Sequence, residues 1–485
     1  MKQVKLWAVV IILMLLIGSI VVISYIMLNK QEKGSQKPFY VGVTYCGDSV
    51  QEAKELIDKV KNYTNLFVLQ SEPFWWNITI LEEIGDYTIA SGLNYAVSGG
   101  TSTAYVNWWV NDAKERWGEP FIGIYYNDEP GGKMLDAHVT LESTVIHDEF
   151  IGGGISVNET IIKHNMGEIT VYDEKQTTYF PDGTINVIIY QHDEQGRVLR
   201  PSSILIIYQP NGTITVHENI FDQENRNVYT AENITKYQLP IQPYEEILKQ
   251  NPIQTFDDSA KAFVNATKET LENRFLDKAQ LEETILVFTS DYGLYWWDYQ
   301  SGYDLVLAQL GWNNSIIQEI GLVRGAANLQ GKSWGTIITW KYTHAPYLAD
   351  GEEIFEQMKT SYENGAEYVL IFNYSEDPEN PNTLQEEHFQ ALERFWNEVV
   401  QNPKVIHCSI KADAALVLPQ NYGWGMRHPE DNIWGIWQAD DTSQQIWSQL
   451  QGKIDEYGLK LDIIYEDPNY PIEGKYSNIY YWYQE

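Results

Sequence analysis

Positive charge and cysteine are scarce in this sequence. Its 33 Lys and Arg residues stand against 67 Asp and Glu residues, which gives a formal net charge of -34. Such a surface repels phosphate backbones and anionic lipid headgroups, so we expect no nucleic-acid partner. The two cysteines, Cys46 and Cys408, are too few for a disulfide scaffold or a thiolate metal site, and we favour two buried thiols over one bridge. The nine histidines show no ligand spacing, so we expect no metal and no cofactor.

Long apolar runs are also missing, except near the N-terminus. The segment from Leu6 to Leu28 contains no charged residue, and roughly 20 such residues span the hydrocarbon core as a helix. No Ala-x-Ala cleavage pattern follows Tyr25, so we predict an uncleaved transmembrane anchor over residues 6–28 rather than a secretory signal. Residues 1–5 would then be a cytoplasmic tail, and the polar residues 29–38 a tether.

Asparagine sequons indicate the side of the membrane that the rest of the chain occupies. Asn-x-Ser/Thr sites are glycosylated only outside the cytoplasm. We therefore predict a single-pass protein of the cell membrane whose C-terminal domains are extracellular. Asn373 also heads a sequon, but it ends a predicted inner strand and we expect it to be inaccessible. The glycosylation candidates are Asn62, Asn77, Asn158, Asn211, Asn233, Asn265 and Asn313.

From Phe39 onward, short apolar strands alternate with amphipathic helices, which is typical of parallel β/α units. Eight such units predict an α/β fold, a (β/α)8 or TIM barrel, over residues 39–132 and 241–402. The sixth strand has a helix as its alternative. The predicted strands are Phe39–Tyr45, Leu66–Gln70, Asn94–Val97, Phe121–Asn127, Thr284–Thr289, Tyr303–Leu310, Trp334–Trp340 and Tyr368–Tyr374.

Residues 133–240 break this rhythm. Their short strands rich in Ile, Val, Tyr and Thr are separated by turn residues, which predicts an inserted β-rich subdomain. The near copies Tyr179–Ile185 and Tyr208–Ile214 indicate a repeated hairpin. Residues 403–485 predict a further, C-terminal α/β domain. Its loop Asn421–His428 is expected either to form a domain interface or to reach over the barrel cleft, and we favour the interface.

The end of the fourth predicted strand carries the most informative motif of the chain. Phe121–Asn127 runs into Asp128, Glu129 and a Pro-Gly-Gly stop. The carboxyl ends of barrel strands meet at one rim, so these acids are expected to face a substrate there. Reading the other strand ends in the same way adds Asp291 as a catalytic candidate. The candidate substrate-binding residues are Tyr45, Glu72, Asn127, Tyr292, Trp296, Trp297, Trp340, Lys341 and Tyr374.

Aromatic residues are abundant, with 17 Trp and 33 Tyr. Their flat faces match the C-H faces of pyranose rings, and their N-H and O-H groups reach sugar hydroxyls. Together with rim acids, they favour glycoside hydrolysis, which needs a carboxylic acid and a second group to stabilise the oxocarbenium-like centre. The alternative for each aromatic residue is core packing, and for Trp296 and Trp297 both interpretations stay open.

Gly123–Glu129 resembles the fourth-strand element of chitinase-like and endo-N-acetylglucosaminidase-like barrels, which belong to the (β/α)8 glycoside hydrolases. This resemblance implies that Glu129 is the general acid, that Asn127 orients a substrate acetamido group and that Trp340 is a floor aromatic. The same residues also resemble the Asn-Glu-Pro element of the large retaining clan. That clan has a nucleophilic Glu at the end of strand seven, where this chain has Trp340 and Lys341.

Two further alternatives remain open. In an inverting mechanism, Glu129 would work with Asp291 or Glu72 across a gap of roughly 6.5–9.5 Å that leaves room for water. Acids at strand ends also shape turns or cap helices, which is the structural alternative for Asp128. We expect a membrane-anchored extracellular glycoside hydrolase that acts on a polysaccharide or glycan. The rival is a non-catalytic module that binds carbohydrate or another ligand through a degenerate barrel, and Lys341 favours it.

Overall fold

The computed structural model describes residues 38–75, 77–98, 108–136, 255–274, 286–312, 314–375 and 382–484, together with strands between residues 146 and 220. The predicted transmembrane span 6–28 and most of the tether lie outside these residues. In the part of the chain that is described, no helix has both the length and the apolar character to cross a bilayer.

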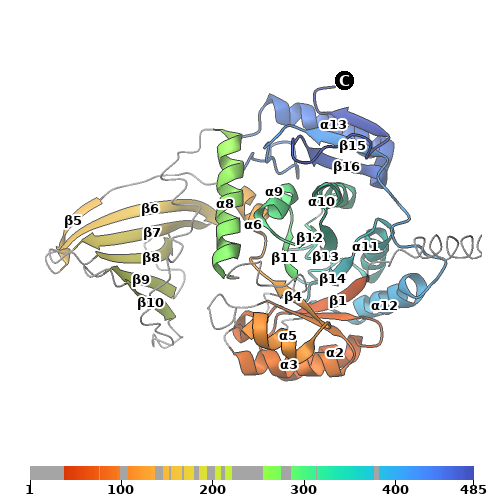
Figure 1. Cartoon of the computed structure of the whole chain (residues 1–485), viewed down its shortest axis with the longest axis horizontal. Helices are drawn as coiled ribbons and strands as arrows, with labels where there is room; N and C mark the ends of the chain where they lie inside the picture. The colour runs from red at the N-terminus through yellow and green to blue at the C-terminus, as the bar shows by residue number, and fades with distance from the viewer. Residues whose placement is uncertain are drawn as a thin grey trace, which may run out of the picture. The chain divides into compact units, whose positions relative to one another are not determined.

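Eight parallel strands form a closed barrel in the order β1-β14-β13-β12-β11-β4-β3-β2 (Figure 1). The predicted (β/α)8 barrel is therefore confirmed, and the sixth predicted strand is a strand. Parallel strands covered by helices are buried on both faces, which explains their nearly continuous apolar sequences. The barrel strands are β1 (Tyr40–Tyr45), β2 (Leu66–Leu69), β3 (Asn94–Ser98), β4 (Phe121–Tyr125), β11 (Leu286–Asp291), β12 (Leu305–Leu310), β13 (Ser333–Ile338) and β14 (Tyr368–Ile371).

Helices connect the barrel strands, and several begin at a side-chain cap. Ser49, Ser315 and Asp350 each accept a hydrogen bond from a backbone N-H of the first turn, as N-cap residues do. The helices of this part are α2 (Val50–Val60), α3 (Ile78–Ala90), α5 (Lys114–Trp117), α6 (Pro130–Asp136), α8 (Phe256–Arg274), α9 (Tyr295–Ser301), α10 (Ile316–Gln330), α11 (Gly351–Glu363) and α12 (Glu386–Phe395), with the 3-10 turn η1 (Glu72–Phe74) and the π-helices η2 (Trp108–Ala113) and η3 (Trp396–Val400).

The barrel core follows the two-residue repeat of a strand, because alternate side chains point to opposite faces. On β12, Leu305 and Leu307 are buried in the core cluster, and on β2 Leu66 and Val68 take the same place. The whole cluster comprises Leu66, Val68, Ala96, Ile122, Tyr125, Phe288, Leu305, Leu307, Ile337, Tyr368 and Leu370.

A six-stranded antiparallel sheet follows the fourth barrel strand in sequence. The repeated hairpin is confirmed, because each near copy spans a turn between two strands. The first runs from the end of β7 at Tyr179 to the start of β8 at Ile185, and the second from the end of β9 at Tyr208 to the start of β10 at Ile214. The sheet contains β5 (Ile146–Ile151), β6 (Gly154–Met166), β7 (Ile169–Tyr179), β8 (Ile185–Asp193), β9 (Ser202–Tyr208) and β10 (Ile214–Ile220).

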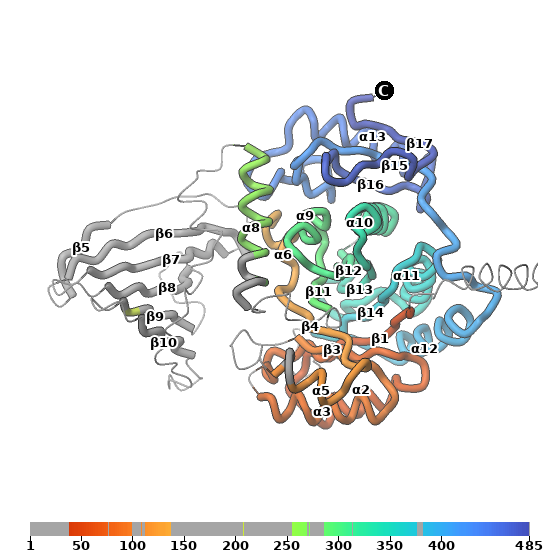
Figure 2. Tube along the Cα trace, viewed as in Figure 1, coloured from red at the N-terminus to blue at the C-terminus, as the bar shows by residue number. Residues whose placement is uncertain are grey.

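The C-terminal part forms a parallel three-stranded sheet in the order β16-β15-β17 with one long helix (Figure 2). Strand β16 contacts barrel helix α10 through a buried ion pair, in which Nε of Arg324 lies 2.7 Å from Oδ1 of Asp462. The elements are β15 (Ala414–Leu418), α13 (Asp441–Tyr457), η4 (Gly458–Lys460), β16 (Leu461–Tyr465) and β17 (Asn478–Tyr481).

Some expectations for single residues were right and others wrong. Both cysteines are free thiols as expected, but Cys408 is exposed, so its expected burial is wrong. Asn373 is 1% exposed, which confirms that it is inaccessible. Among the glycosylation candidates, Asn62, Asn77 and Asn265 are exposed, while the side chains of Asn158, Asn211, Asn233 and Asn313 lie outside the described residues.

Candidate functional site

A cavity of about 190 Å³ lies at the carboxyl ends of the barrel strands. Its wall includes two of the predicted catalytic acids, Asp128 and Glu129, and two of the predicted binding residues, Trp340 and Tyr374. This volume is below the roughly 300–1,000 Å³ of sites for drug-sized ligands, so it suits one ring of a ligand rather than several. The lining residues are Gln70, Tyr125, Asp128, Glu129, Ser290, Gln309, Trp312, Ile337, Thr339, Trp340, Phe372 and Tyr374.

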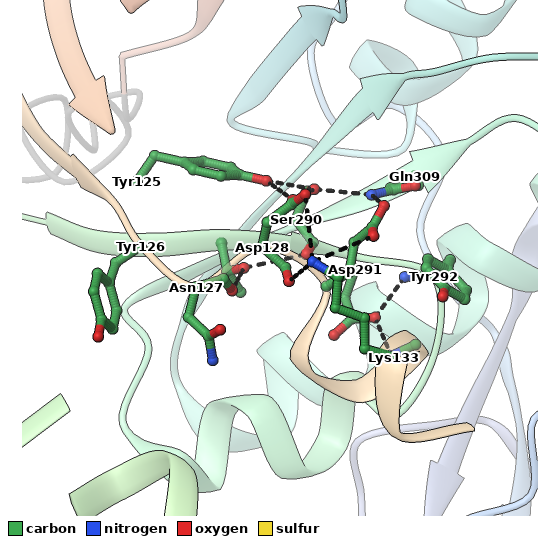
Figure 3. A network of polar contacts seen from close by, with 12 residues as sticks. Tyr125, Tyr126, Asn127, Asp128, Lys133, Ser290, Asp291, Tyr292 and Gln309 are labelled. Carbon is green, nitrogen blue, oxygen red and sulfur yellow. Dashed lines mark hydrogen bonds and ion pairs between the residues drawn. The ribbon is translucent and has the colours of Figure 1, made fainter. Parts of the chain in front are cut away.

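Asp128 is held by donors from two barrel strands. The Tyr125 hydroxyl donates to Oδ1 of Asp128, and the Ser290 hydroxyl donates to the same oxygen over 3.2 Å (Figure 3). Tyr125 and Ser290 are themselves 2.8 Å apart between their hydroxyl oxygens. Nζ of Lys133 lies 3.9 Å from Oδ2 of Asp128. These contacts place a negative side chain at a defined point of the cavity wall.

Glu129 is the second acid of the wall, and its side chain is 24% exposed. Nε2 of Gln309 donates to Oε1 of Glu129 over 2.6 Å, and Nζ of Lys133 lies 3.8 Å from Oε2. Burial raises the pKa of Glu129, and the neighbouring Asp128 raises it further, whereas Lys133 and Gln309 act in the opposite direction. A carboxyl group with a raised pKa that faces a cavity is suited to donate a proton.

The backbone at these acids is strained. Asn127 and Glu129 have φ angles of 54° and 56°, in the left-handed region that non-glycine residues seldom adopt. Two hydrogen bonds to β11 hold this conformation: the Thr289 hydroxyl donates to the Asn127 carbonyl over 2.7 Å, and the Glu129 N-H donates to the Ser290 carbonyl over 3.0 Å. Strained residues that are held in this way cluster at functional sites.

Asp291 does not line the cavity that Asp128 and Glu129 share, although it lies close enough to Glu129 for their charges to interact. Its side chain is 0% exposed and accepts three backbone N-H groups, from Gly131 at 2.6 Å and from Gly132 and Tyr292 at 2.7 Å each. Burial raises the pKa of Asp291 to about 7 although these three donors lower it. Both oxygens of Asp291 are engaged by backbone N-H groups, so this side chain caps helix α6.

Strand β4 ends at Tyr125, before the Pro-Gly-Gly sequence as expected, and Pro130 begins helix α6. Proline fits the first helical position, where no N-H partner is needed. Glycine is required next, since a Cβ on Gly132 would lie 2.2 Å from the Tyr292 ring and one on Gly131 would lie 2.7 Å from the Gly293 carbonyl oxygen. The Asp291 carboxylate can approach the helix only over these bare backbones.

A second buried acid, Asp298, lies behind Asp291. It is 0% exposed, and neither of its carboxyl oxygens has a hydrogen-bond partner among the described residues. Burial raises the pKa of Asp298 well above its ordinary value, and the negative charge of Asp291 raises it further. Two buried acids that repel each other are costly to ionise together, so the pair favours holding a proton.

We expect Asp298→Asn to raise thermal stability at pH 7. The pKa of Asp298 is higher in the folded protein than in the unfolded chain. Its contribution to stability is therefore full below the unfolded pKa and is lost as pH rises, so that Asp298 costs stability at pH 7. Asn keeps a donor for Asp291 without proton uptake, which is worth about 1–3 kcal/mol. Melting temperatures at pH 4 and pH 7 check this, with the exposed Asp48→Asn as control; a gain that is equal at both pH values, or a loss at pH 7, contradicts it.

The opposite side of the cavity is an aromatic wall, formed by Trp312, Trp340 and Tyr374. The rings of Trp340 and Tyr374 are parallel within 8° with their centroids 6.0 Å apart, and Trp312 meets Trp340 at 62° and 5.8 Å. Trp312 and Tyr374 are 43% and 38% exposed, which is unusual for rings of this size. Nε1 of Trp340 donates to the Tyr374 carbonyl over 2.8 Å, so the orientation of the indole is held.

The aromatic cluster after β11 is packing and not a set of sugar subsites. Trp296 and Trp297 are 3% and 0% exposed, and both contact the Tyr465 ring of the C-terminal sheet. The Tyr292 hydroxyl donates to Asp136 over 2.7 Å and does not line the cavity. The loop Asn421–His428 belongs to the same interface, as expected, because its Trp424 is 1% exposed.

Four other predicted binding residues also lie outside the cavity wall. The buried Tyr45 hydroxyl donates to the Ser49 carbonyl, and Glu72 is exposed in the turn η1. The exposed Asn127 side chain points away from Gln309 and Ser290 (Figure 3), so a role in orienting an acetamido group has no geometric support. Lys341 forms an ion pair with Glu353 at 2.5 Å.

Reading the strand ends identifies Gln309, near the end of the sixth predicted strand, but misses Gln70, Ser290 and Trp312 among the site residues. Three of these four residues continue an inward-facing row by two residues: Gln70 follows Leu66 and Val68, Gln309 follows Leu305 and Leu307, and Ser290 follows Phe288. This two-residue repeat was the available signal, since the same face of a strand runs from the core into the cavity. Trp312 lies in a loop and had no such signal.

Within the described residues, no group of three or more His, Cys, Asp or Glu side chains is arranged to hold a metal ion. The groups that line the cavity are carboxyl, amide, hydroxyl and aromatic groups. No protein-family model matches the chain, and a search of curated proteins found no match.

Proposed function

We propose that this protein hydrolyses a glycosidic bond in the barrel cavity, with Glu129 as the general acid. The observation that supports this most is the position of Glu129: it shares one wall with Asp128 and faces aromatic rings across a cavity of about 190 Å³. Glycoside hydrolysis needs a proton donor at the leaving oxygen and negative charge near the oxocarbenium-like centre. Glu129, with its raised pKa, supplies the first group, and Asp128 supplies the second.

The aromatic wall supports a carbohydrate as the substrate. Trp340 and Tyr374 line the cavity with nearly parallel rings, and aromatic faces pack against the C-H groups of a pyranose ring. Gln309 and Ser290 place polar groups on the acid side. A substrate in a cell-surface polysaccharide or glycan agrees with the proposed membrane anchor and extracellular location, which rest on the sequence alone.

A non-catalytic carbohydrate-binding module is the second candidate. Its support is that the two acids seen in the cavity wall come from one loop after β4, while the segment directly after β13 contributes Thr339 and Trp340 and no carboxylate. A retaining enzyme of the usual kind places its nucleophile across the bond from the acid. A module would bind the same sugars through the aromatic wall without releasing products.

Release of reducing ends separates the two candidates. The full-length protein, kept in a mild detergent because of its apolar segment, is incubated with chitin oligomers, mannan and β-glucans. Release that depends on Glu129 and persists in the exposed control Glu72→Gln supports the hydrolase. Binding without release supports the module, and the absence of both binding and release rejects both candidates.

The pH profile gives a further expected outcome. The general acid must be protonated, so the raised pKa of Glu129 keeps activity at pH values where an ordinary Glu is ionised, and activity is lost as pH increases through that pKa. Lys133→Met removes a charge that lowers this pKa and should move the alkaline limb of kcat/KM to higher pH. Lys341→Met, which only breaks the pair with Glu353, should not move it. An unmoved limb in Lys133→Met would contradict this role of Glu129.

A further inference from the structure

The charge of the cavity wall restricts the ligands that it admits. Among the residues that the structure describes, its lining includes the carboxyl groups of Asp128 and Glu129 and no Lys, Arg or His. Lys133 lies beside both acids, at 3.9 and 3.8 Å, and its Nζ also donates to the Asp128 carbonyl over 2.7 Å. A ligand carboxylate would enter next to two acids whose nearby cation is already shared between them, and like charges at such distances repel strongly.

Gln70 supplies an uncharged polar group at another point of the wall. It directly follows β2 on the inward-facing row of Leu66 and Val68, and Oε1 of its amide has no hydrogen-bond partner in the described part of the chain. The second amide of the wall differs, because Nε2 of Gln309 is bound to Glu129 and Ser290. A shielded carbonyl oxygen without a donor is costly, and rotation of the terminal amide turns it towards a ligand.

The order of the strands places Gln70 between the two functional walls. Around the barrel, β2 lies between β4, which carries the acids, and β14, which precedes Tyr374. A sugar ring that stacks on Trp340 and Tyr374 with its scissile oxygen near Glu129 therefore presents an edge to Gln70. A hydroxyl group on that edge both donates and accepts, as the amide does.

We propose that the cavity selects an uncharged sugar ring over one that bears a carboxylate, and that Gln70 recognises a hydroxyl group of that ring. This inference rests on the proposed function, since it names the substrate class of the same cavity. It does not depend on turnover, because binding alone tests it.

The test compares neutral oligosaccharides with their C6-carboxylate counterparts. Glucose, mannose and galactose oligomers with non-hydrolysable thioglycosidic links, and the same oligomers oxidised to uronic acids at the terminal ring, are titrated calorimetrically into the full-length protein, which keeps both acids of the wall. At least one neutral oligomer should bind about tenfold or more tightly than its acidic counterpart at low salt, and added salt should narrow the difference.

Variants of Gln70 test its role directly. Gln70→Leu, in the same background, should weaken binding of that neutral oligomer about 3- to 10-fold, the loss of one or two neutral hydrogen bonds, without lowering the melting temperature of the free protein. Gln70→Glu should increase the discrimination against the acidic oligomer. The control is Gln51→Leu, because Gln51 is exposed on α2 and bonds only to Glu55 among the side chains.

Three results would overturn the inference: an acidic oligomer that binds as tightly as its neutral form, an unchanged Kd in Gln70→Leu, or no binding of any oligomer. Failure of the proposed function is distinguishable from these, because a protein that binds neutral oligomers through Gln70 without releasing reducing ends retains the inference and loses the hydrolase.

Discussion

Glu129→Gln should lower the rate of glycosidic cleavage by about 10²–10⁴-fold, the usual contribution of a general acid. Gln has the same shape and keeps an oxygen for the amide of Gln309, so the cavity wall is retained. It has no proton to donate at the leaving oxygen. The affinity for the uncleaved oligosaccharide should therefore change little, so that the loss falls on kcat rather than on KM. Reducing-end assays together with calorimetry of the same ligand measure the two quantities.

Asp128→Asn makes the test of the site more specific. Asn keeps an acceptor for the Tyr125 and Ser290 hydroxyls but removes the negative charge near the developing cation. Its cleavage rate should also fall, and its alkaline limb should move to lower pH, because Asp128 raises the pKa of Glu129.

Full activity in Glu129→Gln, or a loss of activity that substrates with very good leaving groups do not rescue, contradicts the assignment of Glu129 as the acid.

The second large effect is a loss of stability that we expect in the Arg324→Met variant. Arg324 and Asp462 are 3% and 1% exposed, and the guanidinium also donates to Oδ1 of Asn364 at 2.6 Å and to the carbonyls of Leu459 and Leu461. Removal of Arg324 leaves the Asp462 carboxylate buried without its cation. Loss of one partner of a buried pair costs about 3–5 kcal/mol of unfolding free energy. The midpoint of urea denaturation at pH 7 measures it.

A surface pair provides the control for Arg324→Met. Lys460 and Asp413 are 59% and 53% exposed and 3.5 Å apart, so Lys460→Met should cost less than about 1 kcal/mol. The penalty of Arg324→Met should also shrink as pH falls, because protonation of Asp462 removes the buried charge. In the wild type, burial raises the pKa of Asp462 and Arg324 lowers it, with burial the larger effect. Removal of Arg324 should therefore raise this pKa further. A penalty that is equal at pH 4 and pH 7 would mean that lost packing, and not charge, is responsible.

Local sequence was sufficient for the strands of the barrel and for the two acids at its rim. Apolar runs of strand length separated by amphipathic helices have few alternatives to parallel packing, so the eight units and their order followed from pattern. Asp128 and Glu129 directly follow a short buried strand, and a residue that close to a strand end has little freedom to leave the rim.

The sequence predicted less well whether a residue at a strand end faces into the barrel or out of it. Asp291 is the last residue of β11, and Gln309 lies near the end of β12. Gln309 continues the inward-facing row of its strand. Asp291 follows the inward-facing Ser290, so it points to the other face of the sheet, towards the N-terminus of α6. A count in steps of two from the core residues Phe288 and Leu307 would have separated them. Uncertainty of one residue in a strand boundary does not affect such a count.

Contacts between segments distant in sequence were beyond any local pattern. The bare backbones of Gly131 and Gly132 receive the Asp291 carboxylate from a strand that begins after the β-rich insertion, and Trp296 and Trp297 are covered by a sheet more than a hundred residues later. An acid or an indole in a loop has the same local sequence whether a ligand or the protein itself surrounds it. Hydrophobic periodicity decided the barrel, because burial repeats with the geometry of each element; only the folded chain decided which polar and aromatic groups remained for a ligand, because that depends on which of them other segments had already bound.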